Sequence, residues 1–327
     1  MTLGSLFDGI GGWLLAARHA GVTPLWASEI EPFPCAVTAR HFPDVKQLGD
    51  ITQIDLDEMV PVDIVCAGSP CQDLSIAGKR KGLDGERSGL FRTAVDLVRR
   101  MRERTAGKYP RFFVWENVPG AFSSNRGMDF QAVLEEIGES EIPMPQGNRW
   151  APAGLVQFPG AEIAWRVLDA QYWGVPQRRK RIFLVADFAA DGRCAGEILF
   201  ESEGVCGGPA TGTGTGEEIA RGAEDCARIA VYDMTHAYAV MRRVFGDIAP
   251  TLNARMVTGG NQVPVVLTEG KVRRLTPTEC ERLQGLPDGY TEGGSDTARY
   301  KALGNGMAQP CADYVIRRIV KYAEEVR

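Results

Sequence analysis

The sequence predicts an α/β protein with a doubly wound, mainly parallel sheet and a second, smaller, irregular β-rich domain. The chain has 327 residues, which at about 150 residues per domain suggests two domains. Up to about residue 186, short runs typical of buried strands alternate with amphipathic helical patterns, as in parallel sheets covered by helices on both faces. Beyond Asp187 this alternation stops, and residues 204–216 are too poor in large apolar side chains to form a core.

The elements follow in order along the chain. Strands are expected at residues 3–7, 25–28, 62–67, 112–115 and 182–186. Helices are expected at residues 13–20, 33–42, 90–103 and 130–137. Thr276 and Pro277 are a favourable cap and first residue of a later helix, and residues 307–326 have the pattern of a last amphipathic helix. We therefore divide the chain into residues 1–186, residues 187–290 with an acidic, Gly-rich lead-in, and a segment 291–327 that returns to the first domain.

Composition excludes several classes of protein. Hydrophobic residues make up 44% and charged residues 24%, which is typical of a soluble globular chain and not of a disordered or collagen-like one. No apolar run is long enough to span a membrane, and the first four residues lack the charged start of a secretion signal. We expect a cytoplasmic protein. Eight cysteines without a C-x-x-C pair and three histidines argue against a metal site and a disulfide framework.

Charge is divided unevenly along the second half. Residues 187–227 hold nine acidic residues against Arg193 and Arg221, a net charge of −7, whereas residues 228–274 hold seven basic against three acidic residues, a net charge of +4. The whole chain has a net charge of −5, which by itself argues weakly against a nucleic-acid partner. The basic segment is nevertheless suited to contact phosphates.

The first expected strand runs into a glycine-rich turn, Phe7-Asp8-Gly9-Ile10-Gly11-Gly12, and then a helix. Such a turn lets a ligand approach backbone amides. A dinucleotide fingerprint would need glycine where Leu14 stands, so another adenosine ligand fits better. Glu29 and Asp50, after the next strands, are placed to accept hydrogen bonds from a ribose and an adenine amine. Alternatively, both are solvated loop acids.

A cysteine and a carboxylic acid follow two further strands. Cys71 comes directly after the strand at 62–67, next to a loop that carries Lys79, Arg80 and Lys81, and basic neighbours favour a thiolate. Glu116 ends the strand at 112–115 and therefore reaches the same edge of the sheet. The pair suggests nucleophilic attack combined with protonation of the substrate, although Cys71 taken alone could be a buried filler.

Together these residues resemble the S-adenosylmethionine-dependent DNA cytosine-5 methyltransferases. The similar segments are 5–12 (first motif), 68–75 (nucleophile loop), 116–120 (acid motif), 177–181 (Q-x-R-x-R motif), 274–280 with Leu286-Pro287 (ninth motif) and 304–306 (tenth motif). They occur in the family's order. The resemblance fails only over residues 139–160 and most of 187–270, where the family varies.

The resemblance implies a Rossmann-like methyltransferase fold, a target-recognition domain at 187–290, and methyl transfer from S-adenosylmethionine to C5 of a flipped cytosine in a short duplex sequence, with S-adenosylhomocysteine as product. Cys71 is the implied nucleophile toward C6, and Glu116 the acid toward N3. Arg181, and less directly Arg179, would hold O2 and the active-site loop. The resemblance also implies a restriction-modification type of enzyme.

Cofactor and DNA contacts are implied for two further sets of residues. The cofactor set is Phe7, Asp8, Gly9, Gly11, Glu29, Ile30, Asp50, Ile51, Pro70, Leu90 and Asn305. The DNA set is Gln72, Ser75, Lys79 and Arg80 of a mobile loop, with Arg242, Arg243, Thr251 and Arg255 of the recognition domain. For Phe7 and Leu90 the alternative is simple core packing, and for the recognition residues it is a solvated turn.

Two other classes of protein share some of these features. A tRNA-methylating relative would also have Cys71 and Glu116, but the separate basic domain favours duplex DNA. A non-catalytic DNA-binding homologue would be expected to have lost the nucleophile or the acid, and both are present. We therefore expect a monomeric enzyme that acts on double-stranded DNA.

Overall fold

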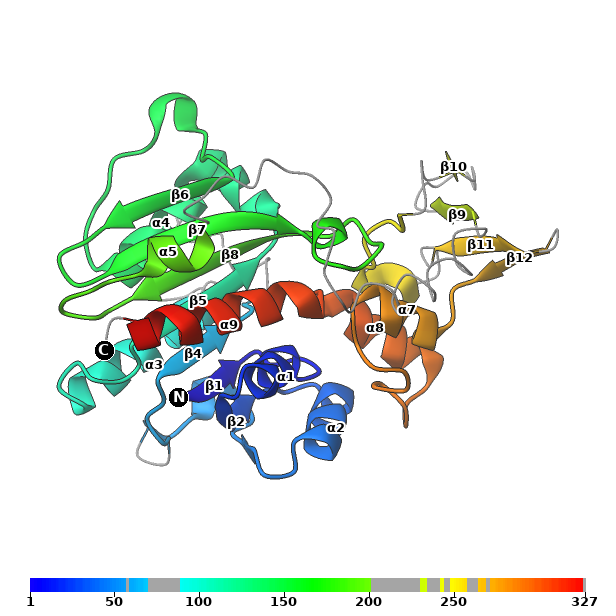
Figure 1. Cartoon of the computed structure of the whole chain (residues 1–327), viewed down its shortest axis with the longest axis horizontal. Helices are drawn as coiled ribbons and strands as arrows, with labels where there is room; N and C mark the ends of the chain where they lie inside the picture. Colours follow the sequence, from blue (N-terminus) through cyan, green and yellow to red (C-terminus); the bar gives the residue numbers. More distant parts are fainter. Residues whose placement is uncertain are drawn as a thin grey trace.

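The chain forms a larger body around an eight-stranded sheet and a smaller body around a four-stranded sheet (Figure 1). A computed structural model describes residues 1–56, 59–69, 89–200, 230–233, 242–243, 248–257, 264–268 and 271–325. Between the two sheets lie the helices α7 and α8, and the last helix runs back under the large sheet. Within these ranges, no helix is both long enough and apolar enough to cross a membrane.

The large sheet has the strand order β3-β2-β1-β4-β5-β8-β7-β6. Its strands are β1 (Thr2–Leu6), β2 (Thr23–Ser28), β3 (Lys46–Gln47), β4 (Ile64–Ala67), β5 (Phe112–Asn117), β6 (Ala153–Gln157), β7 (Glu162–Asp169) and β8 (Lys180–Asp187). The strands from β3 to β5 pair in parallel. Because β1 lies between β2 and β4, the direction of winding changes there, and ligands of such sheets bind outside the strand ends at this point.

The expected doubly wound, mainly parallel sheet is correct for five strands and wrong for the other three. Strand β8 pairs antiparallel with both β5 and β7, and β6 pairs antiparallel with β7. Only residues 158–161 connect β6 to β7, and residues 170–179 connect β7 to β8. A parallel crossover requires a dozen or more residues, so these short connections impose antiparallel pairing. The sequence analysis did not identify β3, β6 or β7.

Two helical layers cover the large sheet. On one face, side chains of β1, β4, β5 and β8 pack against α1 (Gly12–His19), α5 (Ala195–Leu199) and α9 (Gln309–Glu325). On the other face, α3 (Gly89–Arg104) and α4 (Met128–Gly138) bury the alternate side chains. In α3 the buried positions Phe91, Val95 and Val98 recur at helical spacing, which explains why this segment forms an amphipathic helix.

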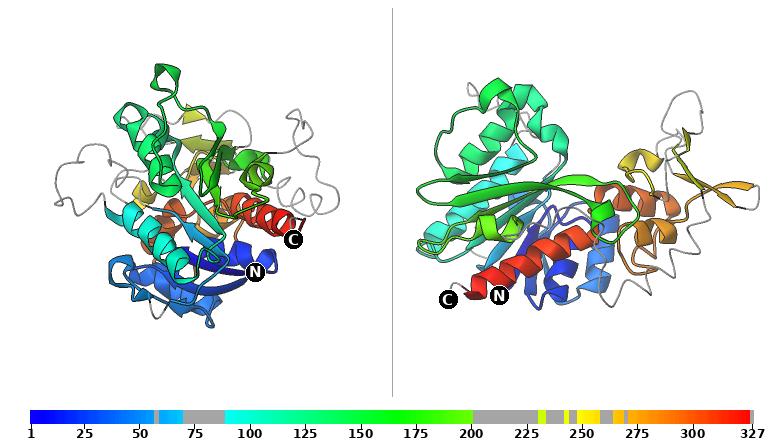
Figure 2. Two further views of the ribbon diagram at one scale, coloured as in Figure 1. Left: turned by 90° about the vertical axis from the view of Figure 1, so that its left-hand side faces the viewer. Right: turned by 45° about the horizontal axis from the view of Figure 1, so that its top comes forward.

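The expected helices are present within two residues of their predicted ends, including α2 (Pro32–His41) and α9. Helix α9 packs along α1, and Figure 2 shows the two side by side from a second direction. Helix α5 was not predicted. It packs against β7, β8 and α9, so residues up to Leu199 belong to the larger body, beyond the predicted boundary at residue 186. The Gly-rich segment 204–216 lies outside the described residues.

The smaller sheet is antiparallel with the order β10-β9-β11-β12. Its strands are β9 (Ala230–Asp233), β10 (Arg242–Arg243), β11 (Val265–Thr268) and β12 (Lys271–Arg274). Helix α7 (Pro277–Leu283) follows, and Thr276 caps it, as the sequence predicted. The cap is a capping box, in which Glu279 also bonds back to Thr276. A third hydrophobic cluster joins α7, α8 (Asp296–Asn305) and the short helix Ala254–Val257 to Ile10 and Val37 of the larger body.

Candidate active site

The candidate site lies along one edge of the large sheet. The parallel strands β1, β2, β4 and β5 all end at this edge, and the antiparallel strand β8 begins there, because Asn117 pairs with Ile182. The edge therefore receives side chains that follow four strands and precede a fifth. This arrangement brings together residues from distant parts of the sequence.

Glu116 and Arg181 meet at this edge. Arg181 Nε lies 3.0 Å from Glu116 Oε1, and the two side chains are only 15% and 14% exposed. Burial raises the pKa of the Glu116 carboxyl above its usual value, while the guanidinium groups of Arg181 and Arg179 oppose this rise without cancelling it. A carboxyl group with a raised pKa is more readily protonated near neutral pH, so Glu116 is suited to give a proton to a ligand.

The chain that leads into the expected nucleophile loop is fixed beside Glu116. Asn117 Nδ2 donates a hydrogen bond to the Ser69 carbonyl at 2.9 Å, and Trp115 Nε1 donates to Ser69 Oγ at 3.0 Å. Ser69 is buried and stands two residues before Cys71. The other expected site residues of this loop lie with Cys71 outside the described residues; they are Pro70, Gln72, Ser75, Lys79 and Arg80.

The Q-x-R-x-R segment alternates between buried and exposed side chains. Gln177 and Arg179 are buried, whereas Arg178 and Lys180 face solvent. The Arg179 guanidinium donates to the carbonyl oxygens of Leu252 (2.6 Å), Gly304 (3.0 Å) and Gly306. Burial and the neighbouring Arg181 lower the pKa of Arg179. Arg179 therefore joins three segments of the fold, and Arg181 is the arginine that meets the acid.

Thr251 and Leu252 dock on the same segment. The Arg178 amide donates to the Ala249 carbonyl at 2.9 Å, and the Ala249 amide donates to the Pro176 carbonyl at 2.7 Å. The Thr251 hydroxyl donates to the Arg178 carbonyl, while its side chain stays exposed. Arg242 and Arg243 form β10, and Arg255 lies in the helix Ala254–Val257, but their side chains lie outside the described part.

The glycine-rich turn after β1 is tightly folded. Phe7, Gly9 and Gly11 all have positive φ values, of 55°, 58° and 85°. A Cβ atom on Gly11 would lie 2.8 Å from the Phe42 ring, so only glycine fits there. Asp8 is buried, and Thr38 Oγ1 donates to its Oδ2 at 3.2 Å. Burial raises the pKa of Asp8 to about 7, although the hydrogen bond from Thr38 acts in the opposite direction.

Glu29 connects this turn to the start of α2. The Gly9 amide donates to Glu29 Oε2 at 2.8 Å, and the amides of Ile30 and Glu31 donate to Glu29 Oε1 at 2.8 and 2.9 Å. These bonds hold the carboxylate at the carboxyl end of β2. Ile30 beside it is 68% exposed, which is unusual for so large an apolar side chain.

The remaining cofactor candidates lie on neighbouring segments. Ser28 Oγ donates to the Gly49 carbonyl at 2.6 Å and so ties the Asp50 turn to the end of β2. Asp50 is exposed and its Oδ1 accepts from the Thr52 amide at 2.9 Å, whereas Ile51 is buried in the core. Leu90 is half-buried near the start of α3. Asn305 is exposed and is the last residue of α8.

Asn305 lies on a segment that packs close to the turn. A Cβ atom on Gly12 would lie 3.6 Å from Gln309 Oε1 and 3.7 Å from Met307. The edge thus carries a candidate catalytic end, with Glu116, Arg181 and Ser69, and a candidate cofactor end, with the turn 7–12 and Glu29. No group of three or more His, Cys, Asp or Glu side chains in the described ranges is arranged to hold a metal ion.

Sequence reasoning missed several residues that shape the site. Ser69 and Asn117 lie inside the recognised segments 68–75 and 116–120, and Trp115 immediately precedes the second, so their position next to Cys71 and Glu116 was the available signal. Tyr290 and Gln309 also contact the turn, but no local pattern indicates contacts that span most of the chain.

Comparison with known proteins identifies a family and several relatives. The family described as C-5 cytosine-specific DNA methylase matches residues 1–190 and 210–321. A protein of Escherichia phage P1 described as a DNA N-6-adenine-methyltransferase is 30% identical over 98% of this chain, which spans 61% of that protein. The type II methyltransferase M2.BsuMI of Bacillus subtilis is 30% identical over 94% of this chain and 72% of its own length.

The fold is also similar to that of solved structures. The S. pombe Dnmt2 methyltransferase superposes with a TM-score of 0.66 over 98% of both chains, at 15% sequence identity. At this identity the similarity concerns the fold alone. It extends over both bodies of the molecule, because nearly the whole chain is covered.

Proposed function

The chain belongs to the C-5 cytosine-specific DNA methylase family, and from this premise we propose that it transfers a methyl group from S-adenosylmethionine to C5 of a flipped cytosine in duplex DNA. One observation carries the proposal. The buried ion pair of Glu116 and Arg181 lies on the edge where Ser69, two residues before Cys71, is held by the strand that delivers Glu116. This supports a site in which an acid and a cation lie beside the start of the loop that carries Cys71.

The proposed reaction begins at Cys71. Its thiolate adds to C6 of the cytosine, and the Glu116 carboxyl gives its proton to N3, so that C5 becomes an enamine carbon. C5 would then take the methyl group, with S-adenosylhomocysteine as the leaving group. Loss of the C5 proton to a base expels the Cys71 thiolate, and N3 returns its proton to the Glu116 carboxylate, which restores the aromatic ring. The raised pKa of Glu116 supports this role, because only the protonated carboxyl can donate to N3.

Arg181 is proposed to assist at the same base. Its Nε is directed at Glu116, and its Nη1 donates to the Lys180 carbonyl at 2.9 Å. A guanidinium has more N–H donors than these bonds use, so it can also hold a carbonyl oxygen such as cytosine O2. Arg179, whose guanidinium is committed to backbone carbonyls, is proposed to act only by positioning this strand.

The cofactor end fits S-adenosylmethionine. The Glu29 carboxylate, held by three amides, suits the ribose hydroxyls, and the exposed Ile30 and half-buried Phe7 offer apolar surface to an adenine ring. Asp50 is exposed and suits the adenine amine. The bound cofactor would supply an electrophilic methyl group next to the catalytic end.

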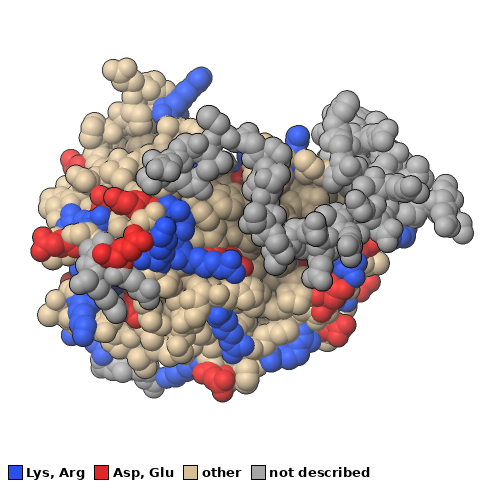
Figure 3. Space-filling model, in the orientation of Figure 1, with Lys and Arg blue, Asp and Glu red and all other residues tan. Residues whose placement is uncertain are grey.

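The smaller sheet is the proposed target-recognition element. Its strand β10 consists of Arg242 and Arg243, and β10 pairs with β9 in the register Arg242 to Asp233. On the larger body, the face in Figure 3 shows Lys and Arg side chains intermixed with Asp and Glu. The basic surplus of residues 228–274 therefore makes the smaller body the better candidate for DNA contact.

The test is to identify the methylated base. Purified protein is incubated with duplex DNA and labelled S-adenosylmethionine, and the DNA is digested to nucleosides for mass spectrometry. We expect 5-methylcytosine, and bisulfite sequencing of DNA from expressing cells would give its sequence context. N6-methyladenine instead, as the name of the phage P1 relative suggests for that protein, or methylation of tRNA and not DNA, would overturn the proposal.

The covalent step needs its own test. Duplex DNA that carries 5-fluorocytosine at the target cannot lose a C5 proton, so the wild-type protein should remain attached to it. Cys71→Ser should form no such adduct and show no methyl transfer, while it still binds S-adenosylhomocysteine. Near-normal turnover by Cys71→Ser would exclude the covalent mechanism.

A further inference from the structure

The turn between β1 and α1 is held by two side chains from the far end of the chain. Tyr290 Oη donates to the Ile10 carbonyl at 2.9 Å in a buried position. Gln309 Nε2 donates to the Gly12 carbonyl at 3.0 Å. These two carbonyls lie on either side of Gly11, whose positive φ value and close contact with Phe42 only glycine tolerates.

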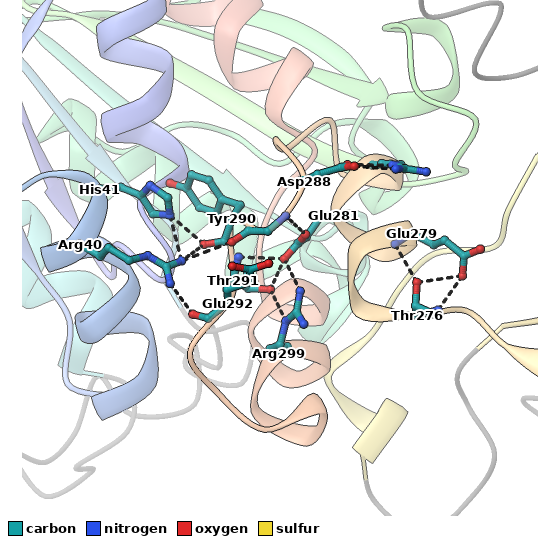
Figure 4. Close-up of polar contacts among 12 residues, drawn as sticks. Arg40, His41, Thr276, Glu279, Glu281, Asp288, Tyr290, Thr291, Glu292 and Arg299 are labelled. Atoms are coloured by element: carbon teal, nitrogen blue, oxygen red, sulfur yellow. Dashed lines mark hydrogen bonds and ion pairs between the residues drawn. The ribbon is translucent and has the colours of Figure 1, made fainter.

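The outer side of the Tyr290 loop is clamped by the end of α2, as Figure 4 shows. The His41 ring stacks on the Tyr290 ring with centroids 4.1 Å apart and planes 3° from parallel. His41 Nε2 also lies 2.8 Å from the Tyr290 carbonyl oxygen. Arg40 donates to the same carbonyl and, at 2.6 Å, to that of Glu292. The orientation of the Tyr290 ring is therefore fixed.

The inner side of the loop is fixed by Glu281 of α7. This fully buried carboxylate accepts from the amides of Gly289 and Thr291, both at 2.8 Å, and from Arg299 Nη2 at 2.9 Å. Burial alone would raise the pKa of Glu281, but the hydrogen bonds from Thr291 and Arg299 outweigh it and lower the pKa. A charged, saturated carboxylate thus holds the loop from inside (Figure 4).

A hydrogen bond to a carbonyl fixes a whole peptide unit. In a trans peptide the C=O and N–H groups point in opposite directions, so holding the oxygen also sets the direction of the next N–H. Tyr290 accordingly orients the peptide unit between Ile10 and Gly11, and Gln309 orients the unit between Gly12 and Trp13. The shape of the turn depends on these two bonds as well as on its own glycines.

We propose that Tyr290 and Gln309 are positioning residues for the cofactor, which keep the turn 7–12 in the shape that S-adenosylmethionine requires. The inference rests on the proposed function, since it places the cofactor at this turn. Neither residue needs to touch the ligand. Their removal should weaken cofactor binding and leave the chemical step intact once cofactor is saturating.

Tyr300 provides a matched control. Its hydroxyl also donates to a backbone carbonyl, that of Leu275, at 2.5 Å, and its half-buried ring packs against the same third hydrophobic cluster. Tyr300→Phe removes a bond of the same kind, but one that does not reach the turn. Any difference between Tyr290→Phe and Tyr300→Phe therefore reports on the turn and not on general stability.

The experiment measures binding of S-adenosylhomocysteine by calorimetry, and KM for S-adenosylmethionine and kcat on DNA, with the full chain. Tyr290→Phe should raise Kd and KM roughly 2- to 10-fold, as expected for one hydrogen bond, with kcat within about twofold of wild type. Gln309→Met, which keeps the side-chain length, should act in the same direction. Tyr300→Phe should leave Kd unchanged.

Some results would overturn this inference and leave the proposed function standing. One is a wild-type Kd in both turn variants, and another is an equal loss of cofactor affinity in Tyr300→Phe. A fall in kcat with an unchanged KM would also contradict it, because a positioning role at the cofactor predicts the reverse. If the wild-type protein itself does not bind S-adenosylhomocysteine, the proposed function fails, and the inference fails with it.

Discussion

Strands β5 and β8 carry one carboxylate and guanidinium pair at each end, and the two pairs are used differently. At one end, Asp187 is fully buried, and each of its oxygens accepts from Arg111 and from a backbone amide, that of Ala189 or Cys194. At the other end, Glu116 has Arg181 as its single ion-pair partner among the described residues. The first carboxylate is saturated, whereas within the described ranges one oxygen of the second accepts no hydrogen bond.

This difference separates a structural ion pair from a candidate catalytic one. Both pairs are largely shielded from solvent, and both consist of an acid and an arginine that link β8 to β5 or to the residue before it, so the presence of an ion pair does not distinguish them. What distinguishes them is the remaining hydrogen-bonding capacity of the carboxylate. A saturated carboxylate can only hold the fold together, whereas an unsaturated buried carboxyl with a raised pKa can exchange a proton with a substrate.

The sharpest test of this comparison is Glu116→Gln. An amide can still hydrogen-bond N3 but cannot protonate it, so kcat should fall about 10²- to 10⁴-fold, the usual contribution of a general acid. DNA affinity should change much less. Steady-state kinetics and a binding assay would show this, and an equal loss of turnover and of DNA binding would assign Glu116 a structural role.

Asp187→Asn should have the opposite pattern. Breaking a buried ion pair from one side typically costs about 3–5 kcal/mol, because the remaining charge is left uncompensated. We expect a large fall in the free energy of unfolding, measured with urea, and an unchanged kcat for the folded enzyme at low temperature. A selective loss of kcat would remove the distinction drawn between the two pairs.

Glu29→Ala tests a carboxylate that lies between these two cases. It accepts hydrogen bonds from three backbone amides, as Asp187 does from two, but its side chain is partly exposed. Loss of its charged hydrogen bonds should weaken S-adenosylhomocysteine binding roughly 10- to 100-fold, as measured by calorimetry. Glu31→Ala is the control, because Glu31 is a neighbouring exposed acid paired with Lys301 at 2.9 Å. Equal affinities for the two variants would make Glu29 an ordinary loop acid.

Asp8→Asn should be visible mainly as a change in the pH dependence of stability. The folded state binds a proton at Asp8 up to about pH 7, whereas the unfolded chain loses it near pH 3.8. The stability that Asp8 contributes is therefore complete below pH 3.8 and is lost as the pH rises to about 7. Relative to wild type, Asp8→Asn should gain stability between pH 5 and pH 8. Parallel melting curves across this range would contradict the buried, proton-binding state.

The predictable part of the fold came from local patterns. The buried runs of β1, β2, β4, β5 and β8 and the amphipathic helices were all identified, since their periodicity is contained in each segment. The direction of β8 was not predictable, because it depends on the lengths of connections to strands that were not recognised. Strand β6 is half exposed along its length, and α5 has only five residues, so neither has a strong pattern.

The candidate site was predictable where chemistry adjoins a strand end. Glu116 and the alternation of Gln177, Arg179 and Arg181 could be identified from the sequence, but the contacts of the arginines could not. Arg179 donates to carbonyls 73 to 127 residues further along the chain. Partners at such a distance produce no pattern in the sequence around Arg179. Tyr290 was missed for the same reason, although it closely follows the recognised Leu286-Pro287.

The bond between Tyr290 and Ile10 joins residues 280 positions apart, and that between Gln309 and Gly12 joins residues 297 positions apart. On the ribosome, the glycine-rich turn is made long before Tyr290 and Gln309, so these two hydrogen bonds can form only after 280 and 297 further residues, respectively, have been added. Long-range closures of this kind also slow folding. A nascent chain that has already built its central strands would therefore still lack a finished turn until residues 290 and 309 have both emerged.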